Sequence, residues 1–447
     1  SAQEEAGPTV IVGDSQRNAG TVYALNASDG SERWKFDTER DVRAPTVVSD
    51  GTVYVGDLGG TLYALDASDG SESWSYQTGA AIASSPSISD GRVYVHDSGG
   101  TLYALEASDG SEAWSFDLET QGSASGKTSS PFVSDGRVYV GSSEGVMYAV
   151  EASDGTGVWS FRTNSSIGSS PTVVDGVVYF ASGAGLYALD SSDGTKLWNR
   201  TGEIPANPSS PTVANGTIYT GGAAIGGEGM SGVGAIQAVD ASDGSGLWNV
   251  TVSRGQVRSS PTVTDGRVYV GTQDGNAYAF NASDGSELWR FETDRGFLSS
   301  PTVVDGVVYI GSRWPDNEIH ALNAEDGSEF WSYAAEGVTY SPTVVGSTEG
   351  SSIGSRVAHG TLGNSDDIQA GEMFVSSELG SIDISTGEPG AVGGNVEDGS
   401  DGDEEVVDTI ETERGSGVTS FLIILGVGAV IAVAVAAVSR REDEDEK

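Results

Sequence analysis

The sequence predicts an all-β fold, an eight-bladed β-propeller, followed by one C-terminal transmembrane helix. Two observations predict the propeller: one motif recurs eight times, and each copy contains four short strand-like segments separated by turn residues. A long uncharged apolar run near the C-terminus predicts the helix. We therefore divide the chain into a propeller (1–390), an acidic stalk (391–417), a transmembrane helix (418–438) and a cytoplasmic tail (439–447).

The repeated motif ends in tryptophan. Ala and Gly hold fixed places ten and four residues before it, and successive copies lie about forty residues apart. Only Trp314 falls outside this pattern, so the register is not an accident of composition. We expect each of these tryptophans to fill the seam between two blades, with the small Ala leaving it room. The eight blade tryptophans are Trp34, Trp74, Trp114, Trp159, Trp198, Trp248, Trp289 and Trp331.

Four segments rich in β-branched and aromatic residues make up one unit. In the unit that ends at Trp114 they are 85–88, 92–95, 102–105 and 113–116. Asp-Gly pairs such as Asp90-Gly91 and Asp109-Gly110 separate the first segment from the second and the third from the fourth. Gly there supplies the positive φ that a tight hairpin needs. Each unit is therefore expected to be a four-stranded blade.

The two ends of the repeat region predict how the ring closes. The first unit lacks an innermost strand, and the last unit is followed by one at 341–345. We expect seven complete blades and an eighth joined from both chain ends. Residues 346–390 break the pattern and form an irregular closing or accessory segment, in which 372–375 and 381–384 look like further strands. The sequence leaves open whether these displace the N-terminal pair or lie outside the ring.

This repeat resembles the pyrroloquinoline-quinone-type (PQQ-like) propeller repeat, which has Ala, an acidic residue two positions on, Gly six on and Trp ten on. All eight copies match Ala, Gly and Trp; the acidic place is Asp or Glu in five copies and Asn26, Asn281 and Asn323 in the others. The resemblance covers roughly residues 9 to 345. It implies a propeller fold, and it is only weakly informative about function because one fold hosts many functions.

The resembled family includes quinoprotein dehydrogenases, which hold the quinone and Ca²⁺ with a catalytic Asp and a Cys pair. It also includes the non-catalytic propeller of the outer-membrane assembly machinery. This chain has no Cys, and most of its connections between strands are too short to enclose a cofactor. We therefore favour the non-catalytic branch and predict no enzyme activity, no catalytic residue, no cofactor and no metal site. An exported oxidoreductase that uses pyrroloquinoline quinone and Ca²⁺ is the alternative.

The charge of the chain restricts its partners and its environment. Lys and Arg number 22 against 65 Asp and Glu, a formal net charge of −43. Such an imbalance excludes nonspecific phosphate binding, so nucleic acid is not an expected partner. A surface rich in carboxylates and poor in Lys repels itself unless salt screens it. We interpret this as adaptation to high salt; an acidic protein at ordinary salt is the alternative.

The C-terminal region predicts a membrane anchor. Residues 418–438 carry no charge, and at ~1.5 Å per residue they are long enough to cross a ~30 Å hydrocarbon core. Arg440 and Arg441 follow, which places the tail in the cytoplasm and the propeller outside the cell. The absence of an apolar leader before Ser1 fits an exported protein whose signal peptide was removed, and a trimmed chain would look the same. Sequons at six asparagines suit an exterior location: Asn26, Asn164, Asn199, Asn215, Asn249 and Asn281.

The repeat also predicts which face of the disc binds a partner. Asp-Gly turns occupy one face, whereas the connections from second to third strand and from blade to blade occupy the other and differ between units. Basic residues are concentrated on that second face, where we predict that a single propeller binds a protein or glycan. The alternative is that these Arg side chains pair with local carboxylates such as Asp41 and Asp294. The candidate residues are Arg43, His96, Lys127, Arg254, Arg258, Arg295, Arg313 and Trp314, with Arg40 beside them.

Two histidines lie within the repeat region. His320 stands where other copies have Tyr in the third strand, so we expect a structural role for it. His96 and Asp97 together supply too few ligands for a metal site.

Overall fold

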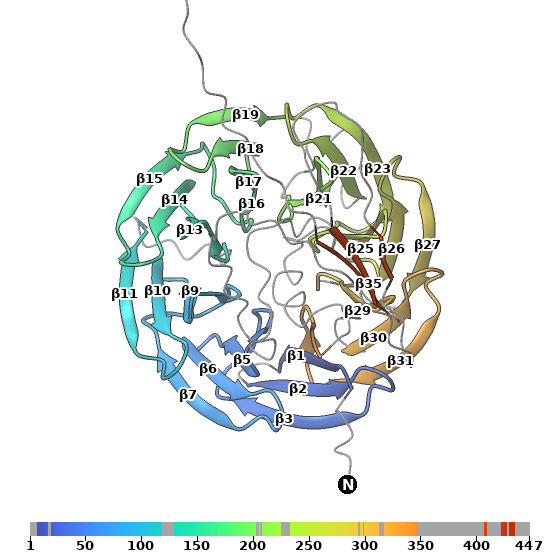
Figure 1. Ribbon diagram of the computed structural model, residues 1–447, viewed down its shortest axis with the longest axis horizontal. Coiled ribbons are helices and arrows are strands. Elements are labelled where there is room, and N and C mark those ends of the chain that lie inside the picture. Colours follow the sequence, from blue (N-terminus) through green and yellow to red (C-terminus); the bar gives the residue numbers. More distant parts are fainter. Residues whose placement is uncertain are drawn as a thin grey trace, which may run out of the picture. The chain divides into compact units, whose positions relative to one another are not determined.

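The computed structural model describes residues 7–346 except 17–18, 119–128, 203–204, 206–207, 225–232, 294–295, 298 and 313–316, and near the C-terminus 406–408, 422–426 and 429–433. The chain divides into two compact units, Ser1–Val375 and Ser376–Lys447. The first unit consists of eight antiparallel sheets arranged in a ring (Figure 1). The predicted eight-bladed propeller is confirmed.

Each blade runs from a short innermost strand to an outermost strand at the circumference of the ring (Figure 1). We number the blades in chain order, and blade 1 consists of β1 (Thr9–Ser15), β2 (Gly20–Asn26), β3 (Glu32–Thr38), β32 (Val338–Thr339) and β33 (Thr343–Val345). Blade 2 is β4 (Val47–Ser49), β5 (Thr52–Gly56), β6 (Thr61–Asp66) and β7 (Glu72–Gln77); blade 3 is β8 (Ser87–Ser89), β9 (Arg92–His96), β10 (Thr101–Glu106) and β11 (Glu112–Asp117); blade 4 is β12 (Phe132–Ser134), β13 (Arg137–Gly141), β14 (Val146–Glu151) and β15 (Gly157–Arg162). Blade 5 is β16 (Thr172–Val174), β17 (Val177–Ser182), β18 (Gly185–Asp190) and β19 (Lys196–Arg200); blade 6 is β20 (Thr212–Ala214), β21 (Thr217–Ala223), β22 (Val233–Asp240) and β23 (Gly246–Arg254). Blade 7 is β24 (Thr262–Thr264), β25 (Arg267–Gly271), β26 (Asn276–Asn281) and β27 (Glu287–Glu292); blade 8 is β28 (Thr302–Val304), β29 (Val307–Gly311), β30 (Glu318–Asn323) and β31 (Glu329–Ala334).

Blade 1 closes the ring with strands from both chain ends, as predicted. Its innermost strand, β33, pairs antiparallel with β1 and places Val345 opposite Thr9. The short β32 pairs with the other end of β1. The N-terminal strands therefore keep their places in the ring. The further strands expected at 372–375 and 381–384 lie outside the described residues.

The turns have the backbone conformations that the Asp-Gly pairs predict. In the turn from β4 to β5, Asp50 has φ 48° and Gly51 has φ 72°, and two positive φ values define the type I′ turn that suits a two-residue hairpin. In the turn from β6 to β7 only Gly70 is positive, and the register shifts by one residue at Ala64/Leu65. A hydrogen bond from Ala67 N to Gly51 O, 2.8 Å long, joins the two turns on one face of the disc.

The blade tryptophans fill the seams between blades, as predicted. Trp34 Nε1 of blade 1 donates a 3.0 Å hydrogen bond to Ala67 O of blade 2. Its ring packs on Gly70, where a Cβ would lie 2.6 Å from Trp34 Cε3. The contact recurs at every seam and ends with Trp331, which donates to Ala27 O across the closure. The repeated Gly thus has a second role beyond turn formation, because it leaves room for the indole of the preceding blade.

A second set of hydrogen bonds links the blades where the innermost strands begin. A recurring Ser-Pro pair, followed by Thr in most copies, supplies both donors and acceptors: Ser130 N donates to Ser170 Oγ, and Thr262 Oγ1 donates to Pro301 O. Equivalent bonds occur at several other seams, including the one from Thr343 Oγ1 to Thr46 O beside the closing blade. The ring is therefore held by tryptophans at its outer edge and by hydroxyl groups near its axis.

The second unit contains one three-stranded antiparallel sheet of β34 (Val406–Asp408), β35 (Leu422–Gly426) and β36 (Ala429–Val433). Where the sequence predicts a single helix over 418–438, the structure thus describes two short strands. Gly426 and Gly428 separate two runs rich in β-branched residues, a composition that favours strands over helix. Among the residues described, no helix is long and apolar enough to cross a membrane. Most of the predicted stalk and the whole predicted tail lie outside the described residues.

Candidate partner-binding face

The variable connections lie together on one face of the disc, which we call the loop face; the face with the Asp-Gly turns is the turn face. Leu58, between the second and third strands of blade 2, donates its N–H to Asp41 O in the connection from blade 1 to blade 2. Ile82, in the next blade-to-blade connection, donates to Asp57 O. The two kinds of connection therefore support each other on both sides of blade 2.

Two candidate Arg side chains are described and exposed on the loop face. Arg43 is about half exposed, and its Nη2 lies 3.4 Å from Asp41 Oδ2. Arg258 is exposed, and its Nε donates to Gln256 Oε1 at 3.4 Å. Arg43 precedes blade 2 and Arg258 precedes blade 7, so blades 7, 8 and 1 separate them along the ring. These two residues therefore do not form one patch. The ion pair of Arg43 with Asp41 is the pairing expected under the alternative in which these Arg side chains only neutralise local carboxylates.

His96 is buried, which corrects the prediction that it contributes to the exposed surface of this face. It is the last residue of β9 and is 3% exposed, and its Nδ1 lies 3.0 Å from Ser129 O of the neighbouring segment. Blades 2 and 4 have Gly56 and Gly141 at the equivalent place. Because burial lowers the pKa of His96, the imidazole is neutral at neutral pH and serves packing.

Of the five remaining candidates, the structure describes only the backbone of Arg254. Arg254 is the last residue of β23 and so belongs to a strand, not to a loop. The other four lie outside the described residues: Lys127, Arg295, Arg313 and Trp314.

Three buried carboxylates of the loop face were not singled out from the sequence. Asp14 lies near the end of β1 in blade 1, and Asp57 and Asp97 lie in the connections between the second and third strands of blades 2 and 3. Each accepts hydrogen bonds from backbone N–H and from a tyrosine. Asp57, for example, accepts from Thr61 N at 2.9 Å and from Tyr63 OH at 3.3 Å. The spacing of Asp and Tyr six residues apart in blades 2 and 3 is the signal that could have identified them.

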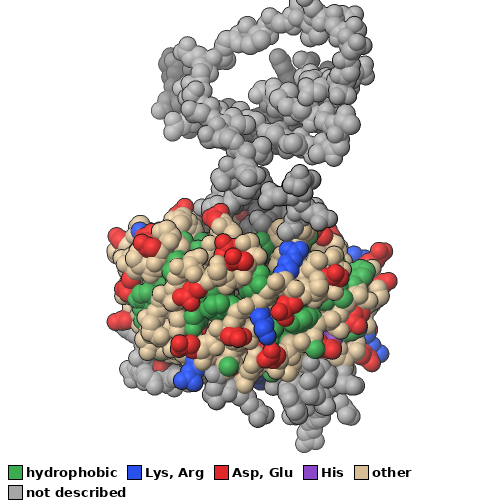
Figure 2. Space-filling view, turned by 90° about the horizontal axis from the view of Figure 1, so that it is seen from below, with side chains coloured by type: hydrophobic (Ala, Val, Ile, Leu, Met, Phe, Trp, Pro, Cys, Tyr) green, Lys and Arg blue, Asp and Glu red, His purple; other side chains and the backbone are tan. Residues whose placement is uncertain are grey.

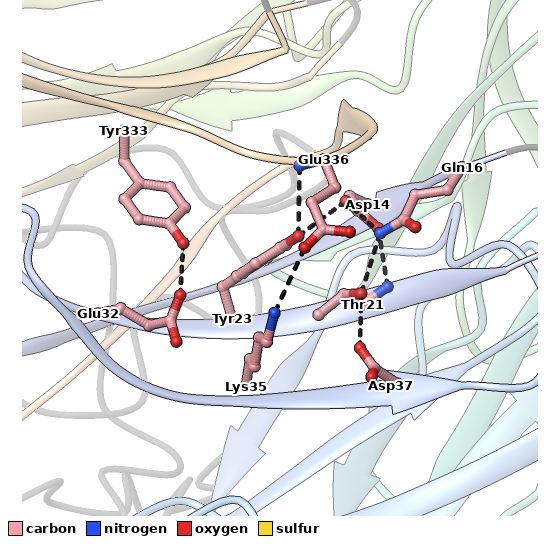
Figure 3. A network of polar contacts seen from close by, with 9 residues as sticks. All are labelled: Asp14, Gln16, Thr21, Tyr23, Glu32, Lys35, Asp37, Tyr333 and Glu336. Carbon is pink, nitrogen blue, oxygen red and sulfur yellow. Dashed lines mark hydrogen bonds and ion pairs between the residues drawn. The ribbon is translucent and has the colours of Figure 1, made fainter.

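The closing seam uses the same arrangement together with an ion pair (Figure 3). Tyr23 OH donates to Asp14 Oδ2 at 3.2 Å and accepts from Glu336 N at 3.3 Å. On the outer side of this seam, Lys35 Nζ lies 3.3 Å from Glu336 Oε1, and Tyr333 OH donates to Glu32 Oε2 at 2.6 Å. Burial raises the pKa of Asp14 and of Tyr23, so this pair is held by hydrogen bonds shielded from water. The network joins the two ends of the propeller.

The described residues do not fit a calcium-bound quinone. Among them, no group of three or more His, Asp or Glu side chains is placed to hold a metal ion, and the chain has no Cys. The three buried carboxylates direct their oxygens at N–H and O–H donors of the protein itself.

His320 occupies a structural position, as its place in the repeat predicts. It is 3% exposed in β30, its ring centroid lies 5.3 Å from that of Phe291 of blade 7, and its Nδ1 lies 2.8 Å from Glu329 Oε1. Tyr63 makes the equivalent contact with Phe36 across its own seam, at 5.5 Å.

Eight registered blades with tryptophan-filled seams define a propeller of the PQQ-like repeat class. A family model described as outer membrane protein assembly factor BamB matches residues 18–135, 117–233 and 232–391. Since these matches cover most of the chain, the protein belongs to this family. No curated protein sequence matches the chain.

Solved structures share the fold at low sequence identity. BamB from Moraxella catarrhalis is 22% identical, with 70% of this chain and 88% of that chain covered and a TM-score of 0.53. The quinohemoprotein alcohol dehydrogenase ADHIIG from Pseudomonas putida HK5 is 19% identical, with 70% and 71% covered and a TM-score of 0.53. The computationally designed Ika8 protein is 17% identical, with 67% and 89% covered and a TM-score of 0.57. At these identities the likeness shows the fold alone.

Proposed function

We propose that this protein is a non-catalytic scaffold at the outer surface of a cell membrane, which binds a protein or glycan partner through the loop face. The observation that carries this proposal is the contrast between the two faces. The turn face repeats nearly the same Asp-Gly turns in every blade, whereas the loop face differs from blade to blade. Variable loops on a rigid framework are where proteins place recognition residues.

The framework under the loop face is well suited to hold such loops in place. Each seam is closed at its outer edge by a tryptophan, and several are also closed near the axis by Ser and Thr hydroxyl groups. Buried Asp and Tyr side chains add hydrogen bonds directly beneath the loops in blades 1 to 3. A preorganised surface of this kind loses little conformational entropy when a partner binds.

The exposed cations of the loop face indicate the partner's chemistry. Arg40, Arg43 and Arg258 are exposed on a chain whose net charge is −43. An Arg guanidinium donates two parallel hydrogen bonds to a carboxylate, which occurs in acidic protein segments and in acidic sugars. A protein partner is the choice that membership of the assembly-factor family supports.

Replacing Arg43 and Arg258 together by Ser is expected to weaken capture of the partner while leaving stability unchanged within ~0.5 kcal/mol per site, because both side chains are exposed. The measurement is affinity capture by the full chain from membrane extracts at high salt, with mass spectrometry or lectin detection, combined with thermal melting. Replacing Arg313 by Ser, which the sequence predicts to lie on the same face, is expected to act in the same direction.

The matched control changes the turn face. Asp50→Asn and Asp265→Asn keep the positive φ of the turns, because Asn tolerates this conformation and Asn215 already occupies it in blade 6. Capture that survives the Arg substitutions but is lost with the Asn substitutions would assign recognition to the turn face.

Membrane attachment is the second part of the proposal and rests on the uncharged run 418–438. An open three-stranded sheet leaves edge N–H and C=O groups unpaired, and hydrocarbon does not tolerate this. Insertion into a bilayer therefore requires this segment to be helical. The orientation follows from Arg440 and Arg441, which favour the cytoplasmic side.

External protease added to intact cells at native salt is expected to release a soluble fragment that contains the propeller. Cleavage should fall within 391–417, the acidic segment between the propeller and the apolar run. Immunoblotting with an antibody against the propeller, and mass spectrometry of the released C-terminus, measure this outcome. A propeller that resists protease until the cells are lysed would reverse the orientation.

The rival proposal is an exported oxidoreductase that uses pyrroloquinoline quinone and Ca²⁺; the shared fold with an alcohol dehydrogenase favours it. Adding pyrroloquinoline quinone and Ca²⁺ to the purified chain distinguishes the oxidoreductase proposal from the scaffold proposal. Stoichiometric quinone absorbance together with reduction of an artificial electron acceptor would establish the oxidoreductase and remove the scaffold proposal.

A further inference from the structure

Four large apolar side chains are exposed in the part of the propeller that the structure describes, and all occupy one place in the repeat. They are Leu197, Leu247, Leu288 and Phe330, which are 51%, 52%, 45% and 56% exposed. Each directly precedes the blade tryptophan in the outermost strand, and the four strands, β19, β23, β27 and β31, belong to the consecutive blades 5 to 8. We call these four residues the apolar arc.

The repeat itself does not require an apolar residue there. Blades 1 to 4 have Arg33, Ser73, Ala113 and Val158 at the same place. Successive side chains of a strand point to opposite sides, so the tryptophan packs into one seam while the residue before it faces away from that contact. Figure 2 views the circumference at the closing blade, where carboxylates lie scattered among hydrophobic, other uncharged and basic side chains. The apolar arc is therefore a local feature of one half of the ring.

Carboxylates lie close to the arc in sequence and are held in place. The turn that precedes each arc residue contains an Asp whose Oδ1 accepts the N–H of the residue two positions on, as Asp243 does from Ser245 at 2.8 Å. At Asp284 and Asp326 the hydrogen bonds from Ser286 and Ser328 lower the pKa, so both are ionised at neutral pH. The arc thus combines apolar side chains with fixed negative charge.

We propose that the apolar arc is a docking surface for a cationic amphipathic polypeptide, in which Lys or Arg alternates with aliphatic residues. Its aliphatic side chains cover the arc and its cations pair with the turn carboxylates. The strands β19, β23, β27 and β31 end their sheets, so an extended segment also meets backbone groups without a strand partner on their outer side. This surface is separate from the loop face and does not depend on the function proposed for it.

Charge complementarity selects this occupant over two others. A second copy of the chain would bring like-charged turns against each other, and the net charge of −43 opposes such contact. An anionic bilayer surface would be repelled by the same carboxylates. A basic polypeptide satisfies both the apolar and the acidic component of the arc.

The test uses the full chain in nonionic detergent and a fluorescent synthetic peptide of alternating Lys and Leu. Fluorescence anisotropy at ~1 M KCl, where the Debye length is ~3 Å, reduces the general attraction of the acidic surface for cations. Combined replacement of Leu197, Leu247, Leu288 and Phe330 by Ser is expected to weaken binding about tenfold or more, since each exposed side chain contributes apolar contact area. The matched control, Ala113→Ser with Val158→Ser in blades 3 and 4, is expected to change binding less than about twofold.

Several results would overturn the proposal. One is equal binding of the peptide by the arc variant and by the control variant. Another is equally tight binding of a peptide in which Glu replaces Lys. Sedimentation that shows a dimer lost only in the arc variant would assign the arc to a second copy, and flotation with anionic vesicles lost only in that variant would assign it to a lipid surface.

Discussion

Replacing Trp198 by Ala is expected to lower the free energy of unfolding by about 3 kcal/mol, the lower end of the range for large aromatic side chains, because the indole is only partly buried. The ring packs on Gly244 of blade 6, and its Nε1 donates a 2.9 Å hydrogen bond to Ala241 O. Truncation leaves a void in the seam between blades 5 and 6. It also leaves the carbonyl oxygen of Ala241 without the hydrogen bond that the indole N–H donates. Urea denaturation followed by tryptophan fluorescence and circular dichroism measures the change.

Two further substitutions identify the seam as the cause. Leu197→Ala changes the neighbouring residue, whose side chain is exposed, and is expected to shift stability by no more than ~0.5 kcal/mol. Gly244→Ala acts from the opposite side of the seam, because Gly244 has φ 75° and a Cβ there would lie 2.7 Å from Trp198 Cε3. It is expected to destabilise the protein as Trp198→Ala does. Unfolding of the Trp198 variant at the wild-type midpoint would show that the seams do not hold the ring.

Most of the propeller could be predicted because the blade motif occurs eight times in the sequence. A single Asp-Gly pair or a single Trp is weak evidence for a turn or a seam, but fixed spacing in every copy excludes chance. The ring closure followed from the strand that the first unit lacks and that 341–345 supply. The inter-blade hydrogen bonds of the Ser and Thr hydroxyl groups near the axis were not predicted. These residues also repeat, but Ser and Thr are common in turns and loops, so their repetition did not indicate a role.

The loop face could be predicted far less well, for the same reason. Each of its connections occurs once, so there is no second copy from which to infer which way a side chain points. His96 is adjacent to a loop in sequence, yet it fills a place where neighbouring blades have Gly. Asp57 and Asp97 resemble surface acids by type, whereas they are buried acceptors for backbone N–H groups and tyrosine hydroxyls. Exposure depended on the tertiary path of the chain, which composition does not encode.

The melting temperature of the protein is expected to rise by several degrees as KCl increases, and to keep rising above ~1 M. The net charge of −43 opposes compaction until it is screened, and the Debye length falls from ~10 Å at ~0.1 M to ~3 Å at ~1 M. Local ion pairs offset little of this charge, because those described, such as Arg43 with Asp41 and Lys35 with Glu336, lie at partly exposed sites. Differential scanning calorimetry over ~0.1 to ~3 M KCl measures the response.

A charge-reduced variant shows whether screening is the cause of that rise. The first-to-second turns of six blades place Asp at positive φ, and blade 6 has Asn215 there instead, so Asp→Asn keeps the backbone conformation of these turns. Six such changes reduce the net charge from −43 to −43 + 6 = −37 and should flatten the dependence of melting temperature on KCl. If the variant and the wild type have the same slope, or if melting of the wild type does not respond to KCl, the acidic surface is not an adaptation to high salt. The six positions are Asp50, Asp90, Asp135, Asp175, Asp265 and Asp305.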